Sequence, residues 1–254
     1  MLSISNLTLK INQKTVLNNI NFNASAGKVI GIIGPNGAGK SSLLKTISQD
    51  LVISEGKIQF HHQQLNQWPK QELATLLGVL PQESSLSFPF TVSDVIAMGL
   101  YPLSISRQQG QIIMDNLLEK LAISHLKNRP YPSLSGGEKQ RVHLARVLTQ
   151  LSQAQKTPLL LLDEPTSALD LAQQHNVLGL VQSLAKHRLY TVITVLHDLN
   201  LASRYTDELL IMKQGEIVQT GLPEQCLTRQ TINDIWHYNP SIMTVGSHTN
   251  PIII

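Results

Sequence analysis

The stretch GPNGAGKSS, Gly34 to Ser42, decides the fold of this 254-residue chain. It matches the pattern G-x-x-x-x-G-K-[ST], and it lies between the apolar run KVIGII and a segment in which Leu43, Leu44 and Ile47 have helical spacing. In that setting the glycines let consecutive backbone N–H groups turn toward one anion, and the positive end of the following helix adds to them. The pattern predicts a strand, a phosphate-binding loop and a helix in succession. The alternative is an ordinary glycine-rich turn, which does not account for the Lys-Ser pair.

The loop supplies most of the candidate nucleotide-binding residues. Lys40 is placed to reach the β- and γ-phosphates, and the hydroxyl of Ser41 is placed to ligate Mg²⁺. The full set of candidates in the loop is Gly34, Pro35, Asn36, Gly37, Ala38, Gly39, Lys40, Ser41 and Ser42.

The composition favours an α/β protein. Aromatic residues make up 4% of the chain and hydrophobic residues 42%, so the core must consist mainly of Leu, Ile, Val and Ala. Such a core is typical of aliphatic parallel strands covered by helices.

Charge and cysteine content exclude several classes of protein. Lys and Arg total 20 against 17 Asp and Glu, and these charges are scattered, so nucleic-acid binding gains no support. Cys226 is the only cysteine, which excludes an intramolecular disulfide and agrees with a reducing compartment. The N-terminus lacks the layout of a signal peptide, and no apolar run approaches the roughly 20 residues needed to span a bilayer. We therefore expect a cytoplasmic protein.

The order of strand and helix patterns predicts three parts. Alternation in SISNLTLKI and VLNNINFNA predicts a small antiparallel β layer, and GKIQF, PLLLLDEP and YTVITVLHD are further strands. The segments TVSDVIAMGL, GQIIMDNLLEKLAI and GGEKQRVHLARVLTQL are amphipathic helices, and LAQQHNVLGLVQSLAKH is a helix between two strands. ELLIMKQGEIVQTG predicts a hairpin that turns at Lys213-Gln214-Gly215. We expect a β core at 1–84 and 158–237, an inserted helical subdomain at 85–150, and a tail at 238–254 that forms at most one more hairpin.

Two carboxylates end the apolar run LLLLDEP, Leu159 to Pro165. Adjacent acids at the end of a buried strand are costly unless a cation or a proton-transfer task accounts for them. We expect Asp163 to hold Mg²⁺ and Glu164 to polarise the attacking water. The alternative is that both carboxylates cap the following helix.

Two further polar residues, Gln82 and His197, follow the strand-like segments LGVLP and YTVITVL. In an open α/β sheet, ligands bind at the carboxyl ends of the strands. There an amide can contact Mg²⁺ and water, and an imidazole can donate to a γ-phosphate oxygen. The alternative is a purely structural role, which is the usual one for a lone Gln or His.

Taken in order, these motifs resemble the nucleotide-binding subunits of ATP-binding cassette (ABC) transporters. The resemblance covers Leu2 to about Cys226 and identifies Gln82 as the Q-loop glutamine, LLLLDEP as Walker B, and His197 as the switch histidine. It further identifies LSGGEKQR as the family signature and SALD as the D-loop. The resemblance implies one ATP-binding domain over 1–254, with a mixed sheet flanked by helices, a small antiparallel β layer and an inserted helical subdomain.

The same resemblance implies a dimer. In this family two subunits pack head to tail, so the signature of one chain binds the γ-phosphate held by Lys40 of the other. It therefore adds Ser135, Gly136, Gly137, Glu138 and Asp170 to the nucleotide-contacting residues. A helix N-terminus behind Gly136 and Gly137 supplies the free N–H groups that such a contact needs.

Further sequence stretches resemble one group within the family and indicate what the dimer transports. The stretches LPQESSLSFPFTVSDVIAMGLYP and VLHDLNLASRYTDELLIMKQGEIVQTG are most similar to those of importers for haem, iron–siderophore complexes and cobalamin. The long connection TQLSQAQKTP, 149–158, favours haem. The resemblance implies ATP and Mg²⁺ as cofactors. It implies integral membrane permease subunits as partners, and a periplasmic or surface substrate-binding protein as an indirect partner. It also implies a peripheral location on the cytoplasmic face of the inner membrane. An ATPase without a transport role, of the iron–sulfur assembly type, is the alternative from another class.

One position departs from the family pattern. Cassette ATPases commonly place an aromatic residue in an early strand to stack on adenine, and this chain has Ile11 there. A branched aliphatic side chain covers one face of the base without aromatic stacking, so we expect weak base discrimination.

Apolar residues after Gln82 have two possible uses. Phe88, Phe90 and Met98 belong to the expected helical subdomain, where such side chains form a core or edge a groove for a helix of a membrane partner. We expect Val95 and Met98 to point inward and Phe88 or Phe90 to lie near the groove.

Overall fold

The computed structural model describes residues 1–82, 88–243 and 250–254. The chain divides into two compact units, one formed by Met1–Trp68 with Gln182–Ile254 and the other by Pro69–Val181. The second unit contains the range 88–150 of the expected helical subdomain together with two strands, while 85–87 lie outside the described residues. The boundaries expected for a narrower subdomain stay a prediction.

The small antiparallel layer predicted at the start of the chain is confirmed in the first unit. Its strand order is β2 (Lys14–Ala24), β1 (Leu2–Ile11), β4 (Glu55–Phe60) and β5 (Gln63–Gln64). The β1–β2 turn consists of Asn12 and Gln13, both at positive φ, as a tight two-residue hairpin turn requires. Alternating apolar residues, among them Leu7, Leu17 and Ile20, are fully buried on one face.

A second, mixed set of strands belongs to the same unit. β3 (Val29–Ile33) pairs in parallel with β8 (Thr191–Val195) and with β9 (Glu208–Lys213), and β9 pairs antiparallel with β10 (Glu216–Gly221). All five residues of β3 are buried, as the apolar run predicts. The β9–β10 turn has Gln214 and Gly215 at positive φ, which confirms the predicted hairpin.

Helices and a short C-terminal hairpin complete the first unit. The helices are α1 (Lys40–Ile47), α7 (Leu199–Tyr205), α8 (Pro223–Cys226) and α9 (Arg229–Trp236). β11 (Ile242–Met243) pairs antiparallel with β12 (Ile252–Ile253), so the tail contains the hairpin considered from the sequence. β12 contacts α7, and α7 also contacts β3.

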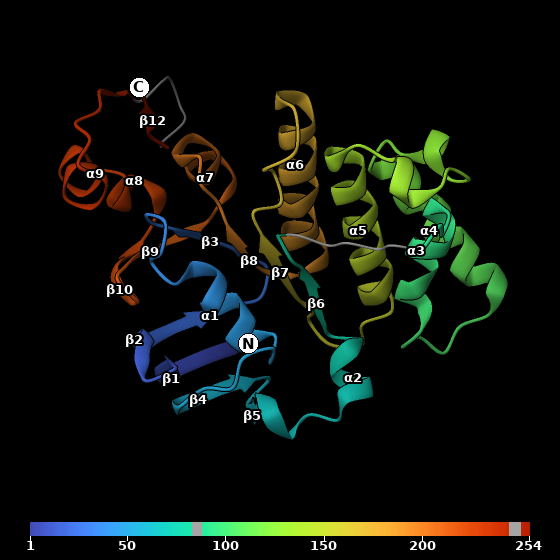
Figure 1. Cartoon of the computed structure of the whole chain (residues 1–254), viewed down its shortest axis with the longest axis horizontal. Coiled ribbons are helices and arrows are strands. Elements are labelled where there is room, and N and C mark those ends of the chain that lie inside the picture. Colours follow the sequence, from blue (N-terminus) through green and yellow to red (C-terminus); the bar gives the residue numbers. More distant parts are fainter. Residues whose placement is uncertain (83–87, 244–249) are drawn as a thin grey trace. The chain divides into compact units, whose positions relative to one another are not determined.

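The second unit contains the helices predicted between 84 and 150. α3 (Val92–Ala97), α4 (Arg107–Lys120) and α5 (Gly136–Leu151) pack against one another, as Figure 1 shows. Each begins with a capping box, at Thr91, Ser106 and Ser135, so the local sequence sets all three helix starts. α2 (Lys70–Ala74) precedes β6 (Leu77–Leu80), which pairs in parallel with β7 (Leu159–Asp163). Among the described residues no helix is both long and apolar enough to cross a membrane.

α6 (Leu171–Arg188) links the two units, because the chain passes from the second to the first between Val181 and Gln182. Short 3₁₀ helices lie at Leu65–Gln67, Met98–Leu100, Ser124–Leu126 and Tyr131–Ser133.

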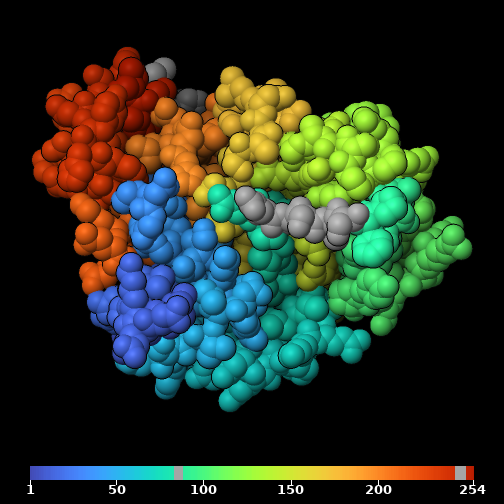
Figure 2. Space-filling view, in the orientation of Figure 1, coloured from blue at the N-terminus to red at the C-terminus, as the bar shows by residue number. Residues whose placement is uncertain are grey.

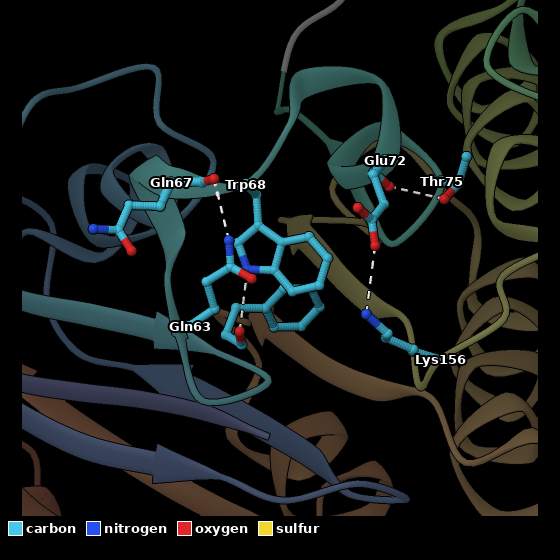
Figure 3. Close-up of polar contacts among 7 residues, drawn as sticks. Gln63, Gln67, Trp68, Glu72, Thr75 and Lys156 are labelled. Carbon is cyan, nitrogen blue, oxygen red and sulfur yellow. Dashed lines mark hydrogen bonds and ion pairs between the residues drawn. The ribbon is translucent and has the colours of Figure 1, made fainter.

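Polar contacts hold connecting segments in each of the two units (Figure 3). In the first unit the indole Nε1 of Trp68 donates to the carbonyl of Phe60 at 3.1 Å, and Gln63 Nε2 donates to the carbonyl of Gln67 at 3.1 Å. In the second unit Lys156 Nζ lies 3.4 Å from Glu72 Oε1. This ion pair ties the connection between α5 and β7 to α2, and because both side chains are about half exposed it stabilises the fold only weakly.

Candidate functional site

The glycine loop lies between β3 and α1, as predicted, and two of its glycines are required by close packing. A Cβ at Gly34 would overlap the carbonyl oxygen of Met212, and a Cβ at Gly39 would lie 2.8 Å from Leu17 Cδ2. Both glycines have positive φ, which disfavours any other residue as well. Gly37 also has positive φ, but a Cβ there would meet no atom within 4 Å. The loop is therefore packed at its base and open at its tip.

Lys40 places a cation inside this loop. Its side chain is buried, and its Nζ donates to the carbonyls of Gly34 at 2.8 Å and Pro35 at 3.0 Å. The first turn of α1, which begins at Lys40, carries no acidic residue. A helix start leaves its first N–H groups without partners inside the helix, and these carry the positive end of the helix dipole. The loop therefore combines an ammonium group, backbone donors and a helix dipole, which suits a phosphate.

Glu164 has an unusual backbone conformation. It follows β7 directly and has φ of 51°, a conformation rare outside glycine. Its carbonyl accepts hydrogen bonds from Gln140 Nε2 at 2.9 Å and Ser167 Oγ at 3.1 Å. Its carboxylate Oε2 accepts from Gln82 Nε2 at 3.0 Å, so two residues expected at one site, Gln82 and Glu164, are brought together.

The N-cap of α6 is Asp170 and not Asp163 or Glu164, which argues against the capping alternative considered from the sequence. α6 begins at Leu171, and the backbone N–H of Gln173 donates to Asp170 Oδ1 at 2.8 Å. Asp170 therefore caps this helix, six residues beyond Glu164. Asp163 is buried at the end of β7.

The signature motif forms the N-terminus of α5. Ser135 Oγ accepts from the backbone N–H of Glu138 at 3.3 Å, and the backbone N–H of Ser135 donates to Glu138 Oε2 at 2.7 Å. That backbone hydrogen bond, more than any other factor, lowers the pKa of Glu138. The side chains of Ser135 and Glu138 thus satisfy the helix start, while the backbone of the exposed Gly136 lies at the surface.

Gln140 is a residue that the sequence reasoning missed. Its amide links the signature helix to the backbone of Glu164, although the two residues are 24 positions apart. Its spacing from Gly136, one helical turn, places both on one face of α5, but nothing local identifies the partner.

The remaining candidates are exposed. Ile11 ends β1 and is 40% exposed, and His197 follows β8 at the surface. Both belong to the first unit with the glycine loop, whereas Gln82, Asp163, Glu164, Ser135–Glu138 and Asp170 belong to the second.

Tyr131, just before the signature, and His143, on α5, form a buried pair. Tyr131 Oη and His143 Nε2 share a hydrogen bond at 2.7 Å. Burial, reinforced by the nearby charge of Arg146, lowers the pKa of His143 to about 4. His143 is therefore neutral at physiological pH.

The apolar residues after Gln82 partly follow expectation. Val95 is fully buried, as predicted, and Phe88 is 70% exposed with its ring 6.0 Å from that of Phe90. Met98 is half-buried, so the expectation that it points inward stays a prediction. α3 ends at Ala97 and a 3₁₀ helix begins at Met98, so the α-helical spacing does not continue through this residue.

Comparisons with known proteins agree on one kind of protein. The family model described as ABC transporter matches residues 17–167. The chain is 54% identical, over the whole length of both chains, to the hemin import ATP-binding protein HmuV of Shewanella denitrificans. It is 43% identical to the protein of that name in Vibrio cholerae, over 97% of this chain and 95% of the relative.

Solved structures resemble the chain in the same way. A putative metal-chelate type ABC transporter in an inward-facing conformation is 26% identical, with a TM-score of 0.81 over 100% of this chain and 96% of that chain. A dimeric ATP-binding cassette in a post-hydrolysis state, bound to ADP and Pi, is 26% identical, with a TM-score of 0.76 over 87% of this chain and 98% of that chain.

Proposed function

The chain belongs to the ABC transporter family, and from this premise we propose that it is the ATPase subunit of an importer that carries haem across the cytoplasmic membrane. Family membership implies ATP binding. The observation that carries the haem assignment is the 54% identity, over 100% of both chains, to a hemin import ATP-binding protein.

We propose that the loop at 34–42 binds the phosphates of ATP. The supporting observation is the buried Lys40 ammonium beside backbone donors at the start of α1. Ser41 and Asp163 would hold Mg²⁺, with Gln82 as a further ligand through its amide oxygen. Oxygen donors of this kind suit Mg²⁺, which would neutralise charge on the phosphate oxygens. Ile11 would cover the adenine base.

Glu164 is the proposed general base. Its carboxylate would accept a proton from the attacking water, while His197 would donate a hydrogen bond to the γ-phosphate. The hydrogen bond from Gln82 to Glu164 fixes the orientation of this carboxylate. Gln140 Nε2, Ser167 Oγ and the backbone N–H of Ser167 all donate to the Glu164 carbonyl and hold its unusual backbone. A residue kept at positive φ by several contacts is typical of a functional position.

The proposed working unit is a head-to-tail homodimer. Gly136 and Gly137 would present the N-terminus of α5 to the nucleotide of the partner subunit, with Ser135, Glu138 and Asp170 shaping that contact. One similar cassette structure is a dimer bound to ADP and Pi, which supports this arrangement for the family. Permease subunits would hold the dimer at the cytoplasmic face of the inner membrane, and a substrate-binding protein would deliver haem to the permease.

Reconstitution tests this function. The chain and its cognate permease are placed in proteoliposomes with the substrate-binding protein, and ATP hydrolysis is measured with haem, an iron–siderophore complex or cobalamin outside. We expect haem alone to stimulate hydrolysis. If the iron–siderophore complex or cobalamin stimulated hydrolysis instead, that compound and not haem would be the transported substrate. If the chain hydrolysed ATP but never co-purified with a permease, a role outside transport would be indicated.

A further inference from the structure

We propose that residues 250–254, at the end of the C-terminal tail, brace α7 through Asn200 and thereby position His197. This inference rests on the proposed function, in which His197 contacts the γ-phosphate. It assigns a task to a segment whose sequence pattern predicts only a hairpin.

The brace consists of four hydrogen bonds between the tail and one face of α7. Asn200 Nδ2 donates to the carbonyl of Ile253 at 2.9 Å, and the backbone N–H of Ile253 donates to Asn200 Oδ1 at 2.8 Å. One turn along the helix, the buried Ser203 Oγ donates to the carbonyl of Pro251 at 2.7 Å, and Asn250 Nδ2 donates to the carbonyl of Ser203 at 2.6 Å. The amide of Asn200 thus pairs with Ile253 as a neighbouring strand would.

The tail is itself anchored. The backbones of Ser241 and Ile254 exchange two hydrogen bonds, at 3.1 and 2.9 Å, which extend the β11–β12 ladder. Arg229 Nε, from α9, donates to the carbonyl of Pro240 at 3.1 Å. In Figures 1 and 2 the red C-terminal residues lie next to the orange α7 segment. The tail is therefore fixed to α9 as well as to α7.

α7 needs such support. A helix of seven residues is not stable by itself in water, so tertiary contacts must hold it. α7 also packs on β3, and a Cβ at Gly31 would lie 2.7 Å from Cγ2 of Thr206, the residue that caps the C-terminus of the helix. The helix is thus held by contacts with both β3 and the tail.

A short chain of contacts runs from the tail to the histidine. Asp198, the residue after His197, caps α7 by accepting from the backbone N–H groups of Asn200 at 2.7 Å and Leu201 at 2.9 Å. Asn200 is therefore joined to Ile253 by its side chain and to Asp198 by its backbone. Loss of the side-chain pair frees the first turn of α7 and, with it, the position of His197.

The proposal is tested by a substitution that removes only the two hydrogen bonds between the Asn200 side chain and Ile253. Asn200→Leu keeps the approximate size of the side chain and loses both hydrogen bonds to Ile253. Because the glycine loop is untouched, we expect kcat for ATP hydrolysis to fall about fivefold while KM for ATP stays within about twofold. Asn21→Leu is the matched control: Asn21 is an exposed residue of β2 whose side chain also makes hydrogen bonds, to Asn6 and Asn19, far from α7 in the chain. It should leave kcat unchanged.

A double-mutant cycle separates positioning from general destabilisation. If Asn200 acts through His197, Asn200→Leu causes no further loss of kcat in a His197→Ala background. An equal fold loss in both backgrounds, or an unchanged kcat with wild-type His197, would overturn the proposal. Should Asn200→Leu fail to fold, Ser203→Ala, which removes the bond to Pro251, enters the same cycle with the same two outcomes.

Failure of the brace and failure of the proposed function give different results. If the wild-type complex does not hydrolyse ATP, or if His197→Ala hydrolyses it at the wild-type rate, the proposed function or the role of His197 is wrong. If both of those hold and Asn200→Leu behaves as wild type, only the brace is wrong.

Discussion

Alanine at Gly137 and alanine at Gly136 make the same chemical change one residue apart, in two different environments. A Cβ at Gly137 would lie 2.7 Å from the carbonyl oxygen of Ala168 and 3.2 Å from Leu169 Cδ2. A Cβ at Gly136 would lie 3.5 Å from Ala168 Cβ, which is an ordinary contact. The pair therefore tests how tightly the start of α5 packs on the segment after Glu164.

The magnitude follows from two opposing effects. Replacing glycine by alanine within a helix stabilises it by up to about 1 kcal/mol, at both positions. Forcing a methyl group into a packed site costs about 1–3 kcal/mol, and only Gly137 faces that cost, because a main-chain oxygen cannot rotate away. We expect the free energy of unfolding of Gly137→Ala to lie about 1–3 kcal/mol below that of Gly136→Ala.

Urea unfolding followed by far-ultraviolet circular dichroism measures this difference. Tryptophan fluorescence is unsuitable, because both tryptophans, Trp68 and Trp236, belong to the first unit, whereas α5 belongs to the second. The same proteins are then assayed for ATP hydrolysis. Under the proposed dimer, Gly136→Ala keeps its stability but loses about tenfold or more in kcat, because its methyl group enters the space of the partner's nucleotide. Equal unfolding midpoints for the two variants would refute the packing argument.

Three further predictions concern charge, catalysis and the base. The pKa of His143 is lowered to about 4 in the folded chain, so the unfolded chain takes up a proton first as the pH falls below about 6.5, and the free energy of unfolding decreases by up to about 3 kcal/mol by pH 4. Urea midpoints at pH 7 and pH 4.5 should therefore show a smaller loss of stability for His143→Gln than for the wild type. Equal losses for the two proteins would contradict this. Glu164→Gln should keep ATP binding, lower kcat by about 10³ and trap a closed dimer in gel filtration with ATP, whereas near-wild-type turnover would remove Glu164 from the role of base. Wild type should hydrolyse ATP and GTP with similar kcat/KM, and Ile11→Tyr should lower KM for ATP about fivefold through stacking worth about 1 kcal/mol; strong preference for ATP in the wild type would show that Ile11 is not the base contact.

Local sequence was sufficient for much of the fold. The run KVIGII, the glycines of the loop and the Lys213-Gln214-Gly215 turn each act within a few residues, since backbone conformation and burial periodicity depend on near neighbours. The helix starts at Thr91, Ser106 and Ser135 likewise follow from capping residues three positions apart.

Contacts between distant segments were beyond such reasoning. The approach of Met212 to Gly34, the hydrogen bond from Gln140 to Glu164 and the pairing of Asn200 with Ile253 join residues 24 to 178 positions apart. No local pattern marks either partner, because an amide side chain or a close-packed glycine is equally compatible with many neighbours.

By itself the sequence determined the glycine loop, the order of strands and helices, and the identity of the candidate residues, because each depends on a short spacing that elementary backbone chemistry interprets. Only the tertiary structure decided which backbone groups the polar side chains bind. Asp170 and not Glu164 caps α6, Gln140 donates to the carbonyl of Glu164, and Asn200 of α7 pairs with Ile253 of the tail. The physical reason is that hydrogen bonds and close packing act over a few ångströms in space, and chain folding alone determines which residues come within that distance.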